Sequence, residues 1–70
     1  MGSCNIRNRI RDLRAANEEM TQQALADAIG VTRQTVVAIE REKYSPSLEV
    51  AFRIASTFDV PLTDVFRYDP

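Results

Sequence analysis

Side chains that commonly perform catalytic chemistry are few in this 70-residue sequence. It contains no histidine, no glycine-rich phosphate loop and one cysteine, Cys4, which can form neither an internal disulfide nor a Cys/His zinc site. Four aspartates are expected at helix ends or in the C-terminal tail: Asp12, Asp59, Asp64 and Asp69. No two of them form a pair suited to acid–base catalysis. We therefore expect no enzyme activity, no metal or other cofactor and no small-molecule ligand.

One short segment, Thr32-Arg33-Gln34-Thr35, combines side chains suited to recognition by hydrogen bonds. An arginine can donate two hydrogen bonds to O6 and N7 of guanine, and a glutamine can pair in a similar way with N6 and N7 of adenine. Polar side chains on an exposed helix face are usually just solvated. The interpretation of this segment therefore depends on the elements that position it.

The spacing of apolar residues predicts an all-α fold of five short helices. Ile6, Ile10 and Leu13 lie at i, i+4 and i+7, which indicates a first helix over 6–17. A fourth helix is expected over 48–58 and a short fifth helix over 61–66, followed by an extended tail that pairs either with residues near the N-terminus or with a second copy. The residues of the fourth helix expected in the core are Leu48, Ala51, Phe52, Ala55 and Phe58.

The second and third helices, over 22–29 and 33–42, have strong local signals. Thr21 and Thr32 are good N-cap residues, and Gly30 can take the left-handed conformation that ends a helix. The connection is too short for an antiparallel hairpin, so the two helices must cross steeply. Ala26 allows their close approach, and the wedge between them is apolar: Leu25, Ile29, Val31, Val36 and Ile39. The pattern predicts a helix-turn-helix motif over Gln22–Arg41.

The segment TQQALADAIGVTRQTVVAIEREKYSPSLEVAFRIASTFDVPLTDVF resembles the lambda-repressor-like (Cro/CI, or XRE) family of helix-turn-helix transcriptional regulators. The resemblance extends from Ile6 to Phe66 and is greatest to very small members of the cytolysin repressor type. It implies one five-helix DNA-binding domain over 1–70 and allows a short C-terminal strand. Segment 14–20 is one residue longer than usual, which should lengthen the first loop without moving the motif.

This resemblance implies that the second motif helix enters the major groove of double-stranded DNA. The residues expected to contact bases are Thr32, Arg33, Gln34, Thr35, Val37 and Ala38. Phosphate contacts are implied for Gln22, Arg41, Lys43, Tyr44 and Ser45. A structural ion pair is implied between Arg14 and Glu40.

Several of these residues have competing interpretations. Arg41 and Lys43 could instead form local ion pairs with the neighbouring glutamates, and Tyr44 could pack under its loop. The N-terminal arginines, Arg7, Arg9 and Arg11, are expected to form a solvated face rather than a DNA clamp.

Association with a second copy is the natural way to stabilise so short a chain without disulfides or metal. The resemblance implies a symmetric homodimer that uses the C-terminal residues Leu62, Val65, Phe66, Arg67 and Tyr68, of which the first three are divided between core and interface. Two recognition helices about one helical turn (~34 Å) apart would then contact an inverted repeat. Repression by covering a promoter is the expected consequence.

The charge and hydropathy of the chain limit its partners. A net charge of −1 argues mildly against nucleic acid, but residues 1–17 hold four arginines against one aspartate, so a local basic face is expected. No apolar run approaches the ~20 residues that span a bilayer. With a free thiol and no export signal, we expect a cytoplasmic protein. The alternative function is a protein-docking or antitoxin-like module of the same fold, although such a module has no need of the polar segment 32–35.

Overall fold

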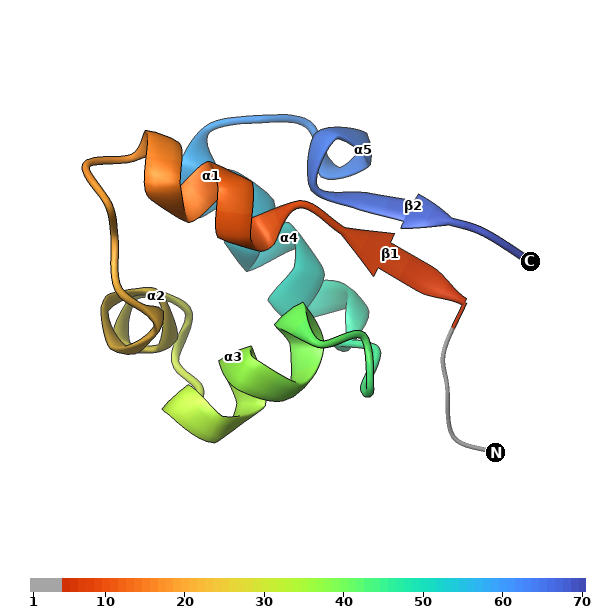
Figure 1. The fold of residues 1–70 in the computed structure, drawn as a ribbon, viewed down its shortest axis with the longest axis horizontal. Helices are drawn as coiled ribbons and strands as arrows, with labels where there is room; N and C mark the ends of the chain where they lie inside the picture. Colours follow the sequence, from red (N-terminus) through yellow and green to blue (C-terminus); the bar gives the residue numbers. More distant parts are fainter. Residues whose placement is uncertain (1–4) are drawn as a thin grey trace.

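The computed structural model describes residues 5–70, so Cys4 lies outside the described part of the chain. The elements, in order, are β1 (Ile6–Asn8), α1 (Ile10–Ala16), α2 (Gln22–Ile29), α3 (Arg33–Glu40), α4 (Leu48–Phe58), α5 (Leu62–Val65) and β2 (Phe66–Tyr68) (Figure 1). The five helices and the short C-terminal strand confirm the fold class predicted from the sequence. None of the helices over 5–70 is long and apolar enough to cross a membrane.

The first helix begins later than its apolar spacing predicted. Ile6 belongs to β1, which pairs antiparallel with β2 so that Ile6 lies opposite Tyr68 and Asn8 lies opposite Phe66. The helix begins at Ile10, whose N–H donates to the side-chain oxygen of Asn8 at 3.1 Å. Placing Ile6 in a helix was therefore wrong. The extended C-terminal tail was expected to pair either with residues near the N-terminus or with a second copy. In the structure it pairs with residues near the N-terminus of the same chain.

The two central helices begin at the residues that the sequence predicted. The hydroxyl of Thr21 accepts a hydrogen bond from the N–H of Ala24 at 3.0 Å, and the hydroxyl of Thr32 accepts one from the N–H of Thr35 at 3.2 Å. Gly30 ends α2 in the left-handed conformation, with φ of 78°. Figure 1 shows α2 almost end-on while α3 lies across the view, so the two helices cross steeply.

All five helices contribute to the core. Its buried members are Ile10, Leu25, Ala26, Ile29, Val36, Ile39, Ile54, Ala55 and Val65. The buried face of α4 consists of Ala51, Ile54 and Ala55, with Phe58 half-buried against the core. Leu48 and Phe52 are 69% and 54% exposed, so the prediction that both lie in the core was wrong.

Candidate nucleic-acid interface

The N-terminal end of α3 presents two polar side chains that have no partner among residues 5–70. Arg33 and Gln34 are exposed, and neither makes a side-chain hydrogen bond or ion pair with another residue of the described chain. The flanking threonines are occupied, because the hydroxyls of Thr32 and Thr35 lie 3.0 Å apart and Thr32 also caps the helix. The caps hold the start of α3 in place while the guanidinium and the amide remain available to a partner. Val37 and Ala38, half-buried, follow on the next turn of α3.

A largely buried ion pair connects this region of α3 to α1. The Nε of Arg14 donates to one carboxylate oxygen of Glu40 at 2.6 Å, and Nη2 donates to the other at 3.0 Å. The two side chains are only 15% and 8% exposed. The guanidinium also donates to the backbone oxygen of Met20 at 2.8 Å, and the amide of Gln22 donates to Glu40 at 3.2 Å. This network fixes the start of α2 relative to α3, and the structure therefore contains the ion pair implied by the resemblance.

A basic hollow lies around this network. It measures about 310 Å³, and its lining consists of Arg11, Arg14, Gln22, Val37, Glu40 and Arg41. Arg14 and Glu40 neutralise each other, while Arg11 and Arg41 are exposed and make no ion pair within residues 5–70. The hollow therefore holds two uncompensated positive charges in a chain whose net charge is −1.

The start of α2 adds hydrogen-bond donors beside this hollow. The first two N–H groups of this helix, those of Gln22 and Gln23, donate to no other residue of the described chain. Such free donors at a helix N-terminus favour an anion.

Arg11 was not among the contact residues predicted from the sequence. A usable signal was present, because Arg11 lies three residues before Arg14, and residues at i and i+3 share one face of a helix. Because Arg14 of α1 was expected to pair with Glu40 of α3, Arg11, one turn earlier on α1, could have been expected beside α3 as well.

The loop after α3 exposes the remaining residues predicted to contact phosphate. Lys43, Tyr44 and Ser45 are all exposed, and Tyr44 keeps 49% of its surface, so it does not pack under the loop. The neighbouring glutamates are engaged elsewhere: Glu40 binds Arg14, and Glu42 accepts from Nη1 of Arg7 at 3.3 Å. No ion pair of residues 5–70 involves Arg41 or Lys43, so neither basic side chain is neutralised locally.

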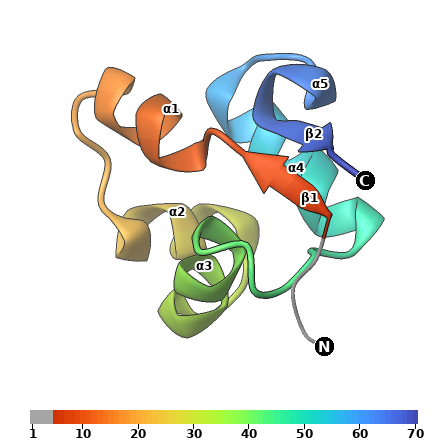
Figure 2. The same cartoon turned by 45° about the vertical axis from the view of Figure 1, so that its right-hand side comes forward.

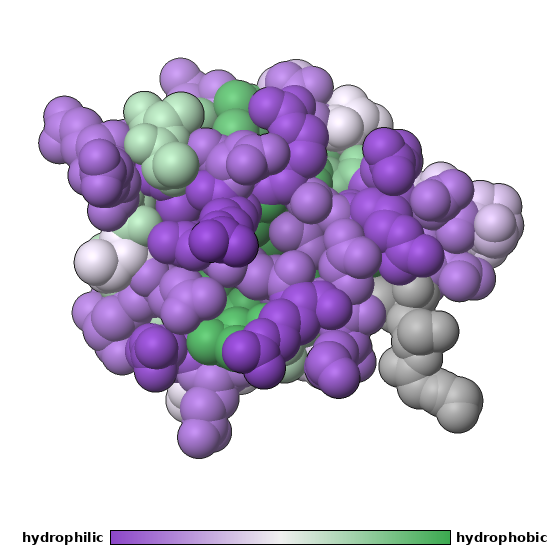
Figure 3. All heavy atoms as spheres, viewed as in Figure 1, coloured by the Kyte–Doolittle hydropathy of each residue, from purple (hydrophilic) through white to green (hydrophobic). Residues whose placement is uncertain are grey.

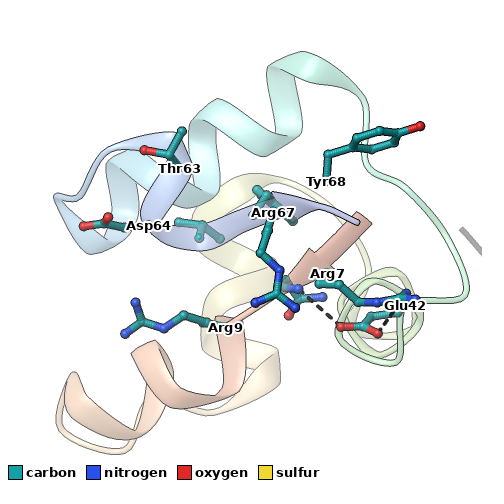
Figure 4. Close-up of a pocket in the computed structure, with 10 residues that line it drawn as sticks. Arg7, Arg9, Glu42, Thr63, Asp64, Arg67 and Tyr68 are labelled. Atoms are coloured by element: carbon teal, nitrogen blue, oxygen red, sulfur yellow. Dashed lines mark hydrogen bonds and ion pairs between the residues drawn. The ribbon is translucent and has the colours of Figure 1, made fainter. Parts of the chain in front are cut away.

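The residues predicted to form a dimer interface are divided by the structure. Val65 is 1% exposed and belongs to the core, so its side chain has no surface to offer a partner. Leu62 and Phe66 are half-buried against the core, whereas Arg67 and Tyr68 are exposed on β2. Figure 4 shows the side chains of Arg67 and Tyr68 extending from β2 in different directions.

The surface seen from the side of Figure 1 is mainly hydrophilic, and its hydrophobic atoms show mostly in hollows between polar side chains (Figure 3).

Comparison with known proteins shows relatives that match most of the chain. The family profile described as helix-turn-helix (HTH_3) matches residues 10–65. The uncharacterized HTH-type transcriptional regulator MJ0272 of Methanocaldococcus jannaschii is 45% identical over 64 residues, which cover 91% of this chain and 96% of the relative. The cryptic phage CTXphi transcriptional repressor RstR of Vibrio cholerae is 34% identical over 58 residues, covering 83% of this chain and 51% of the repressor.

A solved structure has the same fold. The crystal structure of a candidate DNA-binding protein from Bacteroides fragilis superposes with a TM-score of 0.75 over 89% of this chain and 98% of the other, at 24% sequence identity.

Proposed function

This chain belongs to the helix-turn-helix family of DNA-binding transcriptional regulators, of the XRE type that its sequence resembles, and from that premise we propose that it is a sequence-specific repressor that binds an inverted repeat as a homodimer. The observation that supports base reading best is the pair of exposed side chains, Arg33 and Gln34, which have no partner within residues 5–70 at the capped N-terminal end of α3. Residues at this end of a recognition helix meet base edges when the helix lies in the major groove.

In this proposal, α3 supplies the sequence discrimination. Arg33 donates two hydrogen bonds to a guanine, and Gln34 pairs with an adenine. Val37 and Ala38 offer apolar contact to a thymine methyl group one turn further along α3. Thr32 and Thr35 set the start of the helix and lie at the same groove edge.

The basic hollow supplies a phosphate site at the start of α2. Arg11 and Arg41 line the hollow beside Gln22, the first residue of α2, and we assign one backbone phosphate to this space. Gln22 joins them, held in place by Glu40. The exposed residues Lys43, Tyr44 and Ser45 contact the neighbouring phosphates from the loop after α3.

Repression is the consequence that we propose for this binding. RstR, 34% identical to this chain, is named as a transcriptional repressor. A dimer seated on an inverted repeat within a promoter covers DNA that polymerase needs.

The test is a selection from random-sequence duplexes at moderate salt, followed by sequencing of the bound fraction. We expect enrichment of a twofold-symmetric site with a guanine at one position of each half. The same selection with Arg33→Ala should lose the preference at that position and keep the rest. A well-folded wild-type protein that enriches no sequence would contradict the proposal.

A further inference from the structure

A hollow of about 470 Å³ lies beside the β1–β2 ribbon, and the proposed function gives it no role. Its lining includes Arg7, Arg9 and Arg67, together with residues of α5 (Figure 4). Figures 1 and 2 show β1 leading into α1 and β2 following α5, with the two strands side by side. We call this space the ribbon hollow. Its volume lies within the range of roughly 300–1,000 Å³ that is typical of small-molecule sites.

The pairing of the two strands brings the three arginines to one face of the ribbon. Arg7 lies directly opposite Arg67 in the antiparallel register. The N–H of Arg9 donates to the backbone oxygen of Val65 at 2.9 Å, which continues this register by two residues. Because side chains two residues apart along a strand point to the same side, Arg9 shares the face of Arg7.

The positive charges on this face are only partly compensated. Like charges directly opposite each other in a sheet are destabilising, and Arg7 and Arg67 are such a pair. Nη1 of Arg7 lies 3.3 Å from a carboxylate oxygen of Glu42. Nε of Arg7 and Nη2 of Arg67 both lie 3.7 Å from the same carboxylate oxygen of Asp69. The third guanidinium, that of Arg9, forms no ion pair within residues 5–70.

We propose that the ribbon hollow binds a small anion with phosphate or carboxylate oxygens, held between the guanidinium groups of Arg9 and Arg67. A guanidinium presents its N–H donors in a planar fork that matches two oxygens of such a group. The exposed hydroxyl of Thr63, which has no hydrogen-bond partner within residues 5–70, is a further donor in the lining. The negative charge of the ligand also offsets the repulsion between Arg7 and Arg67.

Two carboxylates of the lining limit what the hollow can hold. Glu42 is occupied, because it accepts from Nη1 of Arg7 and from the N–H of Asn8, both at 3.3 Å. Asp64, on α5, is exposed and forms no ion pair within residues 5–70. Its charge opposes an anion, so the site favours a small ligand on the ribbon side over one that fills the whole hollow.

This ligand is not DNA, and the inference does not depend on the proposed function. The ribbon hollow shares no lining residue with the basic hollow at the start of α2. The sequence predicted a solvated face of N-terminal arginines and no small-molecule ligand. The spacing of residues within either segment does not show that Arg7 faces Arg67 across the ribbon.

The test is a titration of the isotope-labelled protein with inorganic phosphate and, separately, with citrate, followed by NMR of the backbone amides. Sodium chloride keeps the ionic strength constant. We expect saturable shifts at Arg9, Thr63 and Arg67, with a dissociation constant for citrate on the order of 1 mM.

Three variants make the titration specific. Arg9→Gln/Arg67→Gln should weaken citrate binding on the order of 10-fold or more, because two charge-assisted contacts are lost. Both side chains are exposed, so this variant should stay folded. Asp64→Asn should tighten binding, since it removes a negative charge from the lining. The matched control Arg11→Gln, which alters only the basic hollow, should leave the shifts at the ribbon hollow unchanged.

Two results would overturn the ribbon hollow as a small-anion site. One is the absence of saturation at its residues for both probes, or saturation that is equally tight in the folded Arg9→Gln/Arg67→Gln variant. The other is a lower salt dependence of DNA binding in that variant without any binding of the probes, which would identify the two arginines as contacts to the DNA backbone.

Discussion

The recognition surface, which consists of residues 32–35 at the start of α3, and the outer face of α4 expose opposite kinds of side chain. The first presents the side chains of Arg33 and Gln34, which have no partner within residues 5–70 and which water can solvate until a polar partner replaces it. The second presents Leu48 and Phe52, whose exposure costs free energy until another apolar surface covers them. The difference teaches that exposed side chains of either kind can indicate a partner, and that their chemistry indicates which one.

The largest expected effect is on the network that supports the recognition surface. Arg14→Ala should lower the free energy of unfolding by about 3–5 kcal/mol, because it leaves the largely buried carboxylate of Glu40 without a cationic partner. Urea denaturation measures this loss. The double variant Arg14→Met/Glu40→Leu should recover most of the stability. A loss below about 1 kcal/mol for Arg14→Ala would show that the pair behaves like an exposed one.

The second effect separates the two surfaces directly. Arg33→Ala should weaken binding to the selected site by about 1–3 kcal/mol and relax discrimination at one base pair, since a bidentate contact is lost. The free energy of unfolding should not change, because Arg33 is exposed and makes no side-chain hydrogen bond or ion pair within residues 5–70. Fluorescence anisotropy on matched and single-substituted duplexes measures the change. Equal weakening on all sequences would identify Arg33 as a phosphate contact instead.

The third effect tests whether local geometry alone specifies the turn of the motif. Gly30→Ala should cost about 1–2 kcal/mol of stability, because a Cβ is strained at the φ of 78°. Space is not the cause, since the new Cβ would lie 3.4 Å from the Arg53 guanidinium, an ordinary contact. Thermal unfolding measures the loss, and Gly30→Asn should cost less because asparagine tolerates this conformation. An alanine variant as stable as the wild type would refute the strain.

The smallest expected effect concerns the basic hollow. Arg11→Ala should reduce the slope of log Kobs against log salt concentration by about 0.9, the value for one phosphate contact. Affinity should fall equally for all duplexes, because a phosphate contact contains no sequence information. Arg9→Ala is the matched control, since Arg9 is exposed but lines a different hollow. An unchanged slope for Arg11→Ala would remove this residue from the DNA contact.

The helix-turn-helix motif was predictable because its determinants are local. A threonine cap acts on an N–H three residues away, and the left-handed conformation of Gly30 is a property of the residue itself. The class of fold and the family followed from the same segment.

The ends of the chain were less predictable because their structure depends on distant residues. Ile6 has helical spacing with Ile10, yet its strand exists only because Tyr68, far along the chain, lies opposite it. The apolar residues of α4 extend around more than one face, and the periodicity alone did not show that Ile54 points inward while Phe52 points outward. Which face of a helix is covered depends on the other helices packed against it, and the spacing within α4 does not specify those.

The measurement that tests the central claim most directly is the affinity for the selected inverted repeat when the spacing of its halves is changed. The account predicts tight binding when the half-sites are about one turn, or ~10 base pairs, apart. Inserting five base pairs places the second half-site on the opposite side of the duplex, so the affinity should fall to that of a single half-site. An affinity that does not depend on this spacing would contradict a rigid symmetric pair of recognition helices.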